Sequence, residues 1–345
     1  MSDVQDLTRA RDLILERIRE DSRFVLATHE KPDGDALGSL VGMQGLLTAL
    51  GKTSAMFIGA EDLPLPREYN LFPLEGLIQA APADIAERTV IFLDCGNIDR
   101  NSAAVLREGR YLLNIDHHHD NTRFGAVNHV VPDASSTAEI VWDLMHGLGV
   151  RPSRLVAQAL YIGLITDTGR FMYENTGPNA HRMAAEMIEA GVDVQLVYRR
   201  LYEEMPPEKV ALLVLALGRL KRFDAGELTL AALSAEDFAE TGAEESYSEG
   251  IIDQLRAIEG TKVAALVREL TSGERKGQRK VSLRATDDDV DVSVIARAQG
   301  GGGHRRAAGF STTLELEQLI AFLRAAIVAQ LHGSSANGHA AASIA

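Results

Sequence analysis

Cysteine, positive charge and long apolar runs are all scarce in this sequence of 345 residues. Its single cysteine, Cys95, cannot build a disulfide framework, which fits a reducing compartment. Lysine and arginine number 35 against 49 aspartates and glutamates, and the resulting net charge of −14 argues against a protein that holds nucleic acid by charge alone. Any nucleotide site must therefore be local.

No segment has the pattern of a membrane span or a secretory signal. The longest apolar run, residues 210–217, is far shorter than the roughly 20 residues that cross a bilayer. The sequence begins with a charged, helical pattern and not with a basic stretch followed by an apolar one. We therefore predict a cytoplasmic protein that does not enter the membrane.

The N-terminal half alternates short apolar runs with helical patterns, after an amphipathic first helix. Strands are predicted at residues 24–27, 54–58, 90–94 and 111–115, and helices at residues 36–50, 137–148 and 154–166. Continuous apolar strands separated by helices are typical of a parallel sheet that is buried on both faces.

The length predicts about two domains, and Pro206 and Pro207 interrupt a helix-rich stretch where a connector would lie. Beyond them, strands are predicted at 228–233, 262–270, 280–285 and 309–312, with helices at 248–258, 292–299 and 314–331. We predict a two-domain α/β protein with a larger N-terminal domain, 1–195, a helical connector, 196–220, a smaller α/β domain, 221–332, and a disordered tail, 333–345.

Acidic residues and histidines follow several predicted strands of the first domain. They are His29, Asp33 and Asp35 after the first strand, Asp94 at the end of another, Asp116, His117 and His118 at the end of a third, and Asp167 after an apolar helix or strand. Ligands of open α/β sheets bind where the carboxyl ends of the strands meet, so we expect these side chains to lie together.

Several carboxylates buried together are unfavourable unless a cation neutralises them. Oxygen ligands with a minority of imidazoles and no thiolate favour Mn²⁺ first and Mg²⁺ as the alternative. Because six ligands are too many for one ion that also holds water and substrate, we predict two divalent ions about 3.5–4 Å apart that share one carboxylate and activate a hydroxide for phosphoester hydrolysis. Taken singly, the segment PDGD is typical of a turn, and an aspartate at the end of a strand is typical of a cap.

A glycine run at 300–303 in the second domain exposes successive N–H groups to a phosphate or base, with His304 and Arg284 as further donors. Basic residues between 268 and 306 give this domain a basic side that could attract an oligonucleotide; the alternative for residues 273–277 is a solvated hairpin tip. In the first domain, Ser136 and Glu139 predict a capping box for the helix that follows.

The order HEKPDGD, LDCGN, DHH and TDTG resembles the DHH phosphoesterase superfamily, and VSLRATDDDVDVSVIARAQGGGGHRRAAGF resembles its DHH-associated domain. The arrangement is most similar to the NrnA-type nano-RNases. The resemblance implies one metal ion on His29 and Asp33 and another on Asp35 and His117, with Asp94 as the bridge and Asp167 on either ion. It also implies that His118 faces the substrate phosphate and that Asp116 orients His117.

The resemblance further assigns substrate binding to one set of residues in the second domain: Arg284, Thr286, Gly301, Gly302, Gly303, His304 and Arg305. Many relatives carry Arg-Ser where this chain has Arg284 and Ala285, so a hydroxyl contact is absent or shifted to Thr286.

The activity implied by the resemblance is metal-dependent hydrolysis of very short oligoribonucleotides to 5′-mononucleotides, and of 3′-phosphoadenosine-5′-phosphate to AMP. Alternatives are a phosphodiesterase acting on cyclic di-AMP or on linear dinucleotides such as pApA and pGpG, and a catalytically silent nucleotide sensor. The predicted partners are these nucleotides, and the apolar residues 210–217 also allow a homodimer.

Overall fold

The computed structural model describes residues 2–101, 103–271 and 276–333, and the chain divides into two compact units, Met1–Glu204 and Met205–Ala345. The predicted connector, 196–220, is thus divided between the two units. Residues 273–275 of the predicted hairpin tip and the predicted tail beyond Gly333 lie outside the described residues.

The first unit is built on a six-stranded parallel sheet in the order β3-β2-β1-β4-β5-β6. Its strands are β1 (Arg23–Ala27), β2 (Thr53–Phe57), β3 (Leu77–Ile78), β4 (Thr89–Leu93), β5 (Tyr111–Asp116) and β6 (Val127–Val130). Its helices are α1 (Ser2–Glu20), α2 (Gly34–Ala49), α3 (Thr137–Gly147), α4 (Arg154–Asp167), α5 (Pro178–Glu189) and α6 (Val194–Tyr198). The chain runs outward from β1 to β3 on one side and continues from β4 to β6 on the other, so β1 and β4 flank the point where the strand order reverses.

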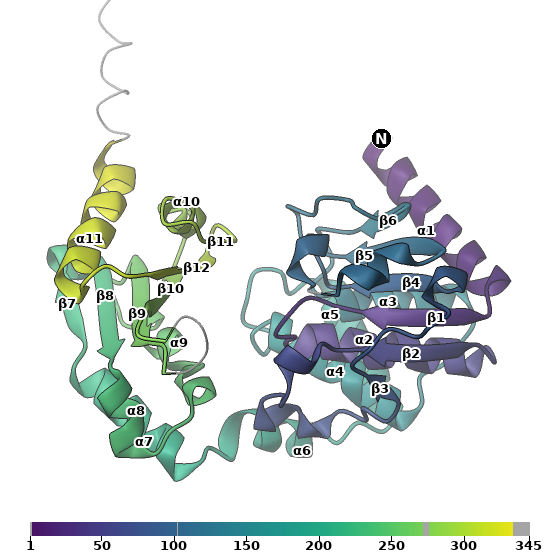
Figure 1. Ribbon diagram of the computed structural model, residues 1–345, viewed down its shortest axis with the longest axis horizontal. Coiled ribbons are helices and arrows are strands. Elements are labelled where there is room, and N and C mark those ends of the chain that lie inside the picture. The colour runs from purple at the N-terminus through teal and green to yellow at the C-terminus, as the bar shows by residue number, and fades with distance from the viewer. Residues whose placement is uncertain (1, 102, 272–275, 334–345) are drawn as a thin grey trace, which may run out of the picture. The chain divides into compact units, whose positions relative to one another are not determined.

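The two faces of this sheet are covered differently. Leu26 and Ile91 face a large core that includes Leu37 and Leu40 of α2 and Leu160 of α4. Figure 1 labels the helices α2 and α4 of this unit. Apolar residues on the opposite face, such as Val90 and Phe92, pack against side chains from 3₁₀ turns and loops: Ile85, Leu106 and Phe124. The strands are therefore buried on both sides, which explains their continuous apolar runs.

Structure and prediction differ at the sheet edges. Strand β3 has only two residues, and β6 has the sequence VNHV, so neither carries a continuous apolar run. Asp167, for which helix and strand were both open, is the last residue of helix α4.

The second unit contains a mixed six-stranded sheet in the order β11-β12-β10-β9-β8-β7, in which only β8 and β9 are parallel. Its strands are β7 (Lys221–Phe223), β8 (Leu228–Leu233), β9 (Val263–Glu269), β10 (Arg279–Ala285), β11 (Gly302–Gly303) and β12 (Ala307–Thr312). Its helices are α7 (Pro207–Gly218), α8 (Ala235–Thr241), α9 (Ile251–Arg256), α10 (Val292–Arg297) and α11 (Leu316–Gly333). The predicted two-domain α/β architecture is confirmed.

Helix α7, which we expected as part of a connector, packs into this second unit. Leu212 and Ala216 are fully buried against Leu233, Phe238 and Leu255. Pro206 and Pro207 open this helix, where a missing backbone N–H is tolerated.

Across the described part of the chain, no helix is both long and apolar enough to cross a membrane.

Candidate metal centre

The six predicted metal ligands converge at the carboxyl end of the parallel sheet. Ligand atoms of His29, Asp33 and Asp94 lie within 4.8 Å of one another, and so do those of Asp35, His117 and Asp167. These side chains come from the loop after β1, the start of α2, the ends of β4 and β5, and the end of α4. Strands β1, β4 and β5 are neighbours in the sheet, so its topology brings these segments together.

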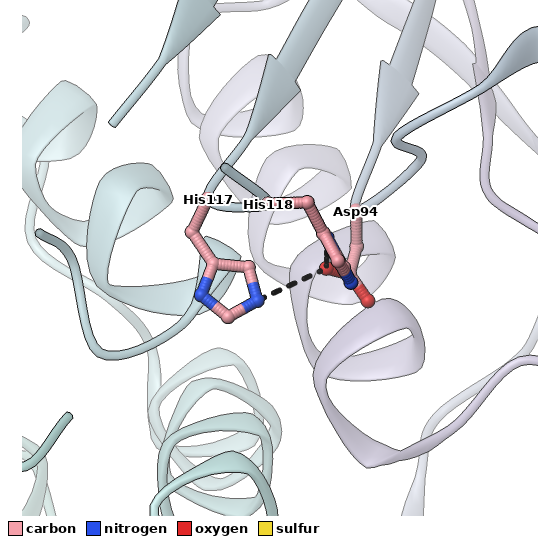
Figure 2. Close-up of side chains that lie close together, drawn as sticks. All are labelled: Asp94, His117 and His118. Atoms are coloured by element: carbon pink, nitrogen blue, oxygen red, sulfur yellow. Dashed lines mark ion pairs between the residues drawn. The ribbon is translucent and has the colours of Figure 1, made fainter. Parts of the chain in front are cut away.

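Asp94 belongs to the first group but also faces the second, because one of its carboxylate oxygens is turned toward His29 and the other toward His117. Its Oδ2 is 3.6 Å from Nε2 of His29, and its Oδ1 is 3.7 Å from Nε2 of His117. Figure 2 shows the imidazoles of His117 and His118 beside the same carboxylate. The backbone of Asp94 has φ +56°, an unusual value for a residue other than glycine and one that is concentrated at functional sites.

The rings of His29, His117 and His118 are each oriented by a contact at Nδ1. Nδ1 of His29 lies 2.7 Å from the carbonyl oxygen of Glu30, and Nδ1 of His117 lies 3.4 Å from that of Ala134. Both rings therefore present Nε2 toward Asp94, as metal-binding histidines commonly do.

Asp116 contacts a different ring from the one we expected. Its Oδ1 pairs with Nδ1 of His118 at 2.8 Å, while His117 reaches the same oxygen only through its backbone N–H, at 2.9 Å. Asn121 donates to the other oxygen of Asp116 at 2.5 Å. The reason is geometric: adjacent residues at a strand end point in different directions, and the ring two positions along returns to Asp116.

The carboxylates are held by hydrogen bonds from several elements. Asp33 caps α2, its Oδ1 accepting the N–H groups of Asp35 and Ala36 at 3.0 and 3.1 Å. Asp33, which belongs to the predicted PDGD turn, is therefore both the cap of α2 and a predicted metal ligand. Asp167 accepts from Asn175, whose side-chain amide lies 3.4 Å from Oδ2 and also donates to the carbonyl oxygens of Asp167 and Ser135, at 3.2 and 2.9 Å.

The electrostatics of the centre are dominated by burial and by charge of one sign. Burial, followed by the charge of Asp94, raises the pKa values of Asp35 and Asp167 well above their usual range. For Asp94 burial acts in the same direction, but the hydrogen bond with His29 and the charges of His118 and His117 lower its pKa. Burial alone would lower the pKa of His118, yet the hydrogen bond to Asp116 and the charge of Asp94 raise it to about 10.

This donor set fits a pair of hard divalent cations. Four carboxylates and two imidazoles supply only oxygen and nitrogen, and the buried Cys95 donates its thiol to the carbonyl oxygen of Asn97. In the described parts of the chain, no lysine or arginine forms an ion pair with any of the four aspartates. Their mutual repulsion is what a bound cation would relieve.

The predicted substrate-binding residues lie together in the second unit. Gly302 and Gly303 form β11 beside β12. Arg284, the penultimate residue of the neighbouring strand β10, lies opposite Ala307, and His304 exchanges backbone hydrogen bonds with Ala307. Gly303 has φ +133°, and a Cβ on it would lie 2.5 Å from the carbonyl oxygen of Ala307, so glycine is required there.

Several of these side chains already have partners within the chain. Arg284 donates to the carbonyl oxygen of Leu283 at 3.1 Å. The hydroxyl of Thr286 donates to the carbonyl oxygen of Lys262 at 3.3 Å. Arg305 donates to the carbonyl oxygen of Asp288 at 2.7 Å and pairs with its carboxylate. Of the wider basic side, Arg268 is partly buried and donates to the carbonyl oxygen of Glu245 and the hydroxyl of Ser248, so it supports the fold.

Sequence reasoning did not assign Asn175 or Thr137 to the centre. Asn175 stands eight residues after Asp167 in a loop, and no motif marks it. The capping box predicted from Ser136 and Glu139 is only half formed: Ser136 accepts the N–H of Glu139, but the Glu139 carboxylate accepts from Ser135. No motif marks the part that Thr137 plays either, because its contacts with Asp35 and Asp94 arise only when α3 packs beside the start of α2 and the end of β4.

Comparisons with known proteins agree with this architecture. Residues 23–164 match the DHH family, N-terminal domain, and residues 227–343 match the DHHA1 domain. The chain is 36% identical over 298 residues, 85% of each sequence, to the bifunctional oligoribonuclease and PAP phosphatase NrnA of Thermus thermophilus. It is 25% identical to the NrnA of Bacillus subtilis, over 84% of this chain and 88% of that one.

A solved structure, an exopolyphosphatase-related protein from Bacteroides fragilis, superposes with a TM-score of 0.84 at 22% identity, covering 93% of this chain and 96% of that one. This likeness shows that the two proteins share a fold.

Proposed function

Because the chain belongs to the DHH family of phosphoesterases, we propose that it hydrolyses very short oligoribonucleotides to 5′-mononucleotides and converts 3′-phosphoadenosine-5′-phosphate to AMP. The observation that carries the proposal is Asp94, whose two oxygens face two separate groups of metal-ligand side chains. The similarity to NrnA proteins along most of the chain supports the choice of substrates.

Two divalent cations would be held by the six ligands. His29, Asp33 and Asp94 form one position, and Asp35, His117 and Asp167 form the other, with Asp94 shared. The oxygen-rich donor set favours Mn²⁺, with Mg²⁺ as the alternative. When bound, such ions lower the pKa of water and offset charge on the phosphoryl group.

The remaining residues of the centre would hold and orient the substrate. The ring of His118, fixed by Asp116, would donate to a phosphate oxygen or to the leaving group. Arg284, Thr286, the glycines of the run, His304 and Arg305 would hold the nucleotide in the second unit.

The test is product analysis with purified protein and either Mn²⁺ or Mg²⁺. The substrates are an RNA dinucleotide, a longer RNA, cyclic di-AMP, linear pApA and pGpG, 3′-phosphoadenosine-5′-phosphate and pyrophosphate. We expect fastest release of mononucleotides from the dinucleotide and of AMP from the bisphosphate. Faster turnover of cyclic di-AMP than of the RNA dinucleotide and the bisphosphate, or turnover of pApA or pGpG alone among the linear dinucleotides, would contradict the substrate assignment.

Asp94→Asn keeps the shape of the side chain and removes its charge. Because metal ions supply several kcal/mol of transition-state stabilisation, we expect turnover to fall on the order of 10³-fold. Asp99→Asn is the matched control: Asp99 lies on the same loop, is exposed and pairs with Arg107. If the wild-type protein binds nucleotide to saturation but hydrolyses none of the substrates with either metal, the proposed enzymatic activity is wrong and a nucleotide sensor is favoured.

A further inference from the structure

Thr137, the first residue of α3, contacts two of the four site aspartates. Its backbone N–H donates to Oδ2 of Asp35 at 2.7 Å, and its hydroxyl donates to Oδ1 of Asp94 at 3.1 Å. The threonine is fully buried, and the two aspartates come from the start of α2 and the end of β4. One residue thus connects a ligand of the second metal position to the carboxylate shared by both.

The start of α3 is itself held in place. Ser136 caps the helix by accepting the N–H of Glu139 at 3.1 Å, and the Glu139 carboxylate accepts the N–H and hydroxyl of Ser135. Ala138 donates a second N–H to Asp35, at 2.9 Å from Oδ1. Two N–H groups at a helix N-terminus, where the dipole favours negative charge, therefore face one buried carboxylate.

The hydroxyl of Thr137 decides how the Asp94 carboxylate is turned. The terminal torsion of an aspartate is soft, so hydrogen bonds set its orientation. A donor on Oδ1 keeps this oxygen on the side of His117 and leaves Oδ2 toward His29. Without that donor, Oδ1 loses a buried hydrogen bond and the carboxylate can turn.

We propose that Thr137 is a positioning residue for both metal positions: its N–H orients Asp35, and its hydroxyl orients Asp94. In this role Thr137 acts through the two carboxylates, which it fixes before cations bind. This inference rests on the proposed two-metal function. It adds a residue, and a mechanism of orientation, to the ligand set itself.

The test is calorimetric titration of the full-length protein with Mn²⁺. Thr137→Val keeps the shape and the N–H but removes the hydroxyl, while Thr137→Ser keeps both donors. Loss of an orienting group commonly weakens metal binding about 10–100-fold, so we expect a loss in this range for the valine variant. The serine variant should bind within a few-fold of wild type.

Thr229→Val is the matched control. Thr229 is also fully buried, and its hydroxyl pairs with that of Thr261 in the second unit at 2.8 Å. We expect this variant to lose stability but to bind Mn²⁺ as wild type does. Equal Mn²⁺ affinity of wild type and folded Thr137→Val would overturn the inference, whereas a wild-type protein that binds no Mn²⁺ would overturn the proposed function instead.

Thr137→Pro separates the two contacts. Proline is favoured at the first position of a helix, and Ser136 before it is already extended, at φ −166° and ψ 162°. This variant lacks both the hydroxyl and the N–H that faces Asp35, so it should bind Mn²⁺ more weakly than Thr137→Val. Equal affinities of folded proline and valine variants would overturn the role assigned to the N–H, and circular dichroism establishes folding. The valine and serine variants decide the role of the hydroxyl independently.

Discussion

Aspartates cluster in both units of the protein, but their surroundings are opposite. In the first unit, Asp35 and Asp94 are buried and receive N–H and hydroxyl donors, with histidine as the nearest basic side chain. In the second unit, Asp287 and Asp289 pair with Lys262, and Asp288 pairs with both Arg305 and Arg306. Asp288 and Asp289 are exposed to solvent, and Asp287 is partly exposed.

The comparison distinguishes a cation-binding cluster from a loop that is neutralised by the chain itself. Carboxylates that already have lysine or arginine partners gain little from a metal ion, and exposed pairs of this kind contribute little to stability. Carboxylates that are buried together without such partners repel one another, and they are oriented mainly by neutral donors. The buried cluster of the first unit therefore lowers the stability of the protein when no cation is bound, and it favours cation binding. The paired aspartates of the second unit do neither.

His129 sharpens the comparison by showing whether burial without a partner has an energetic cost away from the metal centre. Its ring is buried on β6, and within the described residues its Nδ1 has no hydrogen-bond partner. Burial, opposed by the charge of Asp143 on α3 and reinforced by that of Arg11 on α1, lowers its pKa from 6.5 to about 4.

The expected consequence is loss of stability in acid. Above pH 6.5 the ring is neutral in both the folded and the unfolded chain, so it has no effect. As the pH falls from 6.5 to 4, only the unfolded chain takes up the proton, and the free energy of unfolding should fall by about 3 kcal/mol. Denaturant unfolding of wild type and His129→Leu at pH 7 and pH 4 measures this difference, because the other titrating groups cancel. The same change with pH in both proteins would contradict the prediction.

Asn175 tests whether a neutral donor matters for a ligand other than Asp35 and Asp94. Its amide reaches Asp167 at 3.2 and 3.4 Å, which are long hydrogen bonds. We therefore expect Asn175→Ala to weaken Mn²⁺ binding by about tenfold, at the lower end of the range for such contacts. Asn179→Ala is the control, since Asn179 is exposed and accepts from Arg182. Unchanged binding by the Asn175 variant in the titration would limit positioning to the start of α3.

Asp288 gives the smallest expected effect and comes from the other side of the comparison. Asp288→Ala removes a negative charge beside Arg305 and Arg306 and so makes this surface more attractive to an anionic nucleotide; KM should fall a few-fold and depend more steeply on salt. Thermal stability should hardly change, because the three side chains are substantially exposed. Steady-state kinetics at low and high salt measures both effects, and a rise in KM would show that Asp288 itself helps to hold the substrate.

Much of the fold follows from local patterns. The four predicted strands of the first unit overlap β1, β2, β4 and β5, and those of the second unit overlap β8, β9, β10 and β12. Continuous apolar runs identify strands that are buried on both faces. Edge strands such as β3 and β6 were missed because pairing with a neighbouring strand, and not their own composition, makes them strands.

The sequence by itself determined which residue types could bind a cation, because aspartates and histidines follow apolar segments in a recognisable order. Only the tertiary structure decided that Asp94 divides its oxygens between two groups, that Asp116 contacts His118 and that α3 begins against Asp35 and Asp94. The physical reason is that residues far apart in the chain meet through strand order and helix packing. The direction of a hydrogen bond between them is a property of that packing, and no local pattern carries it.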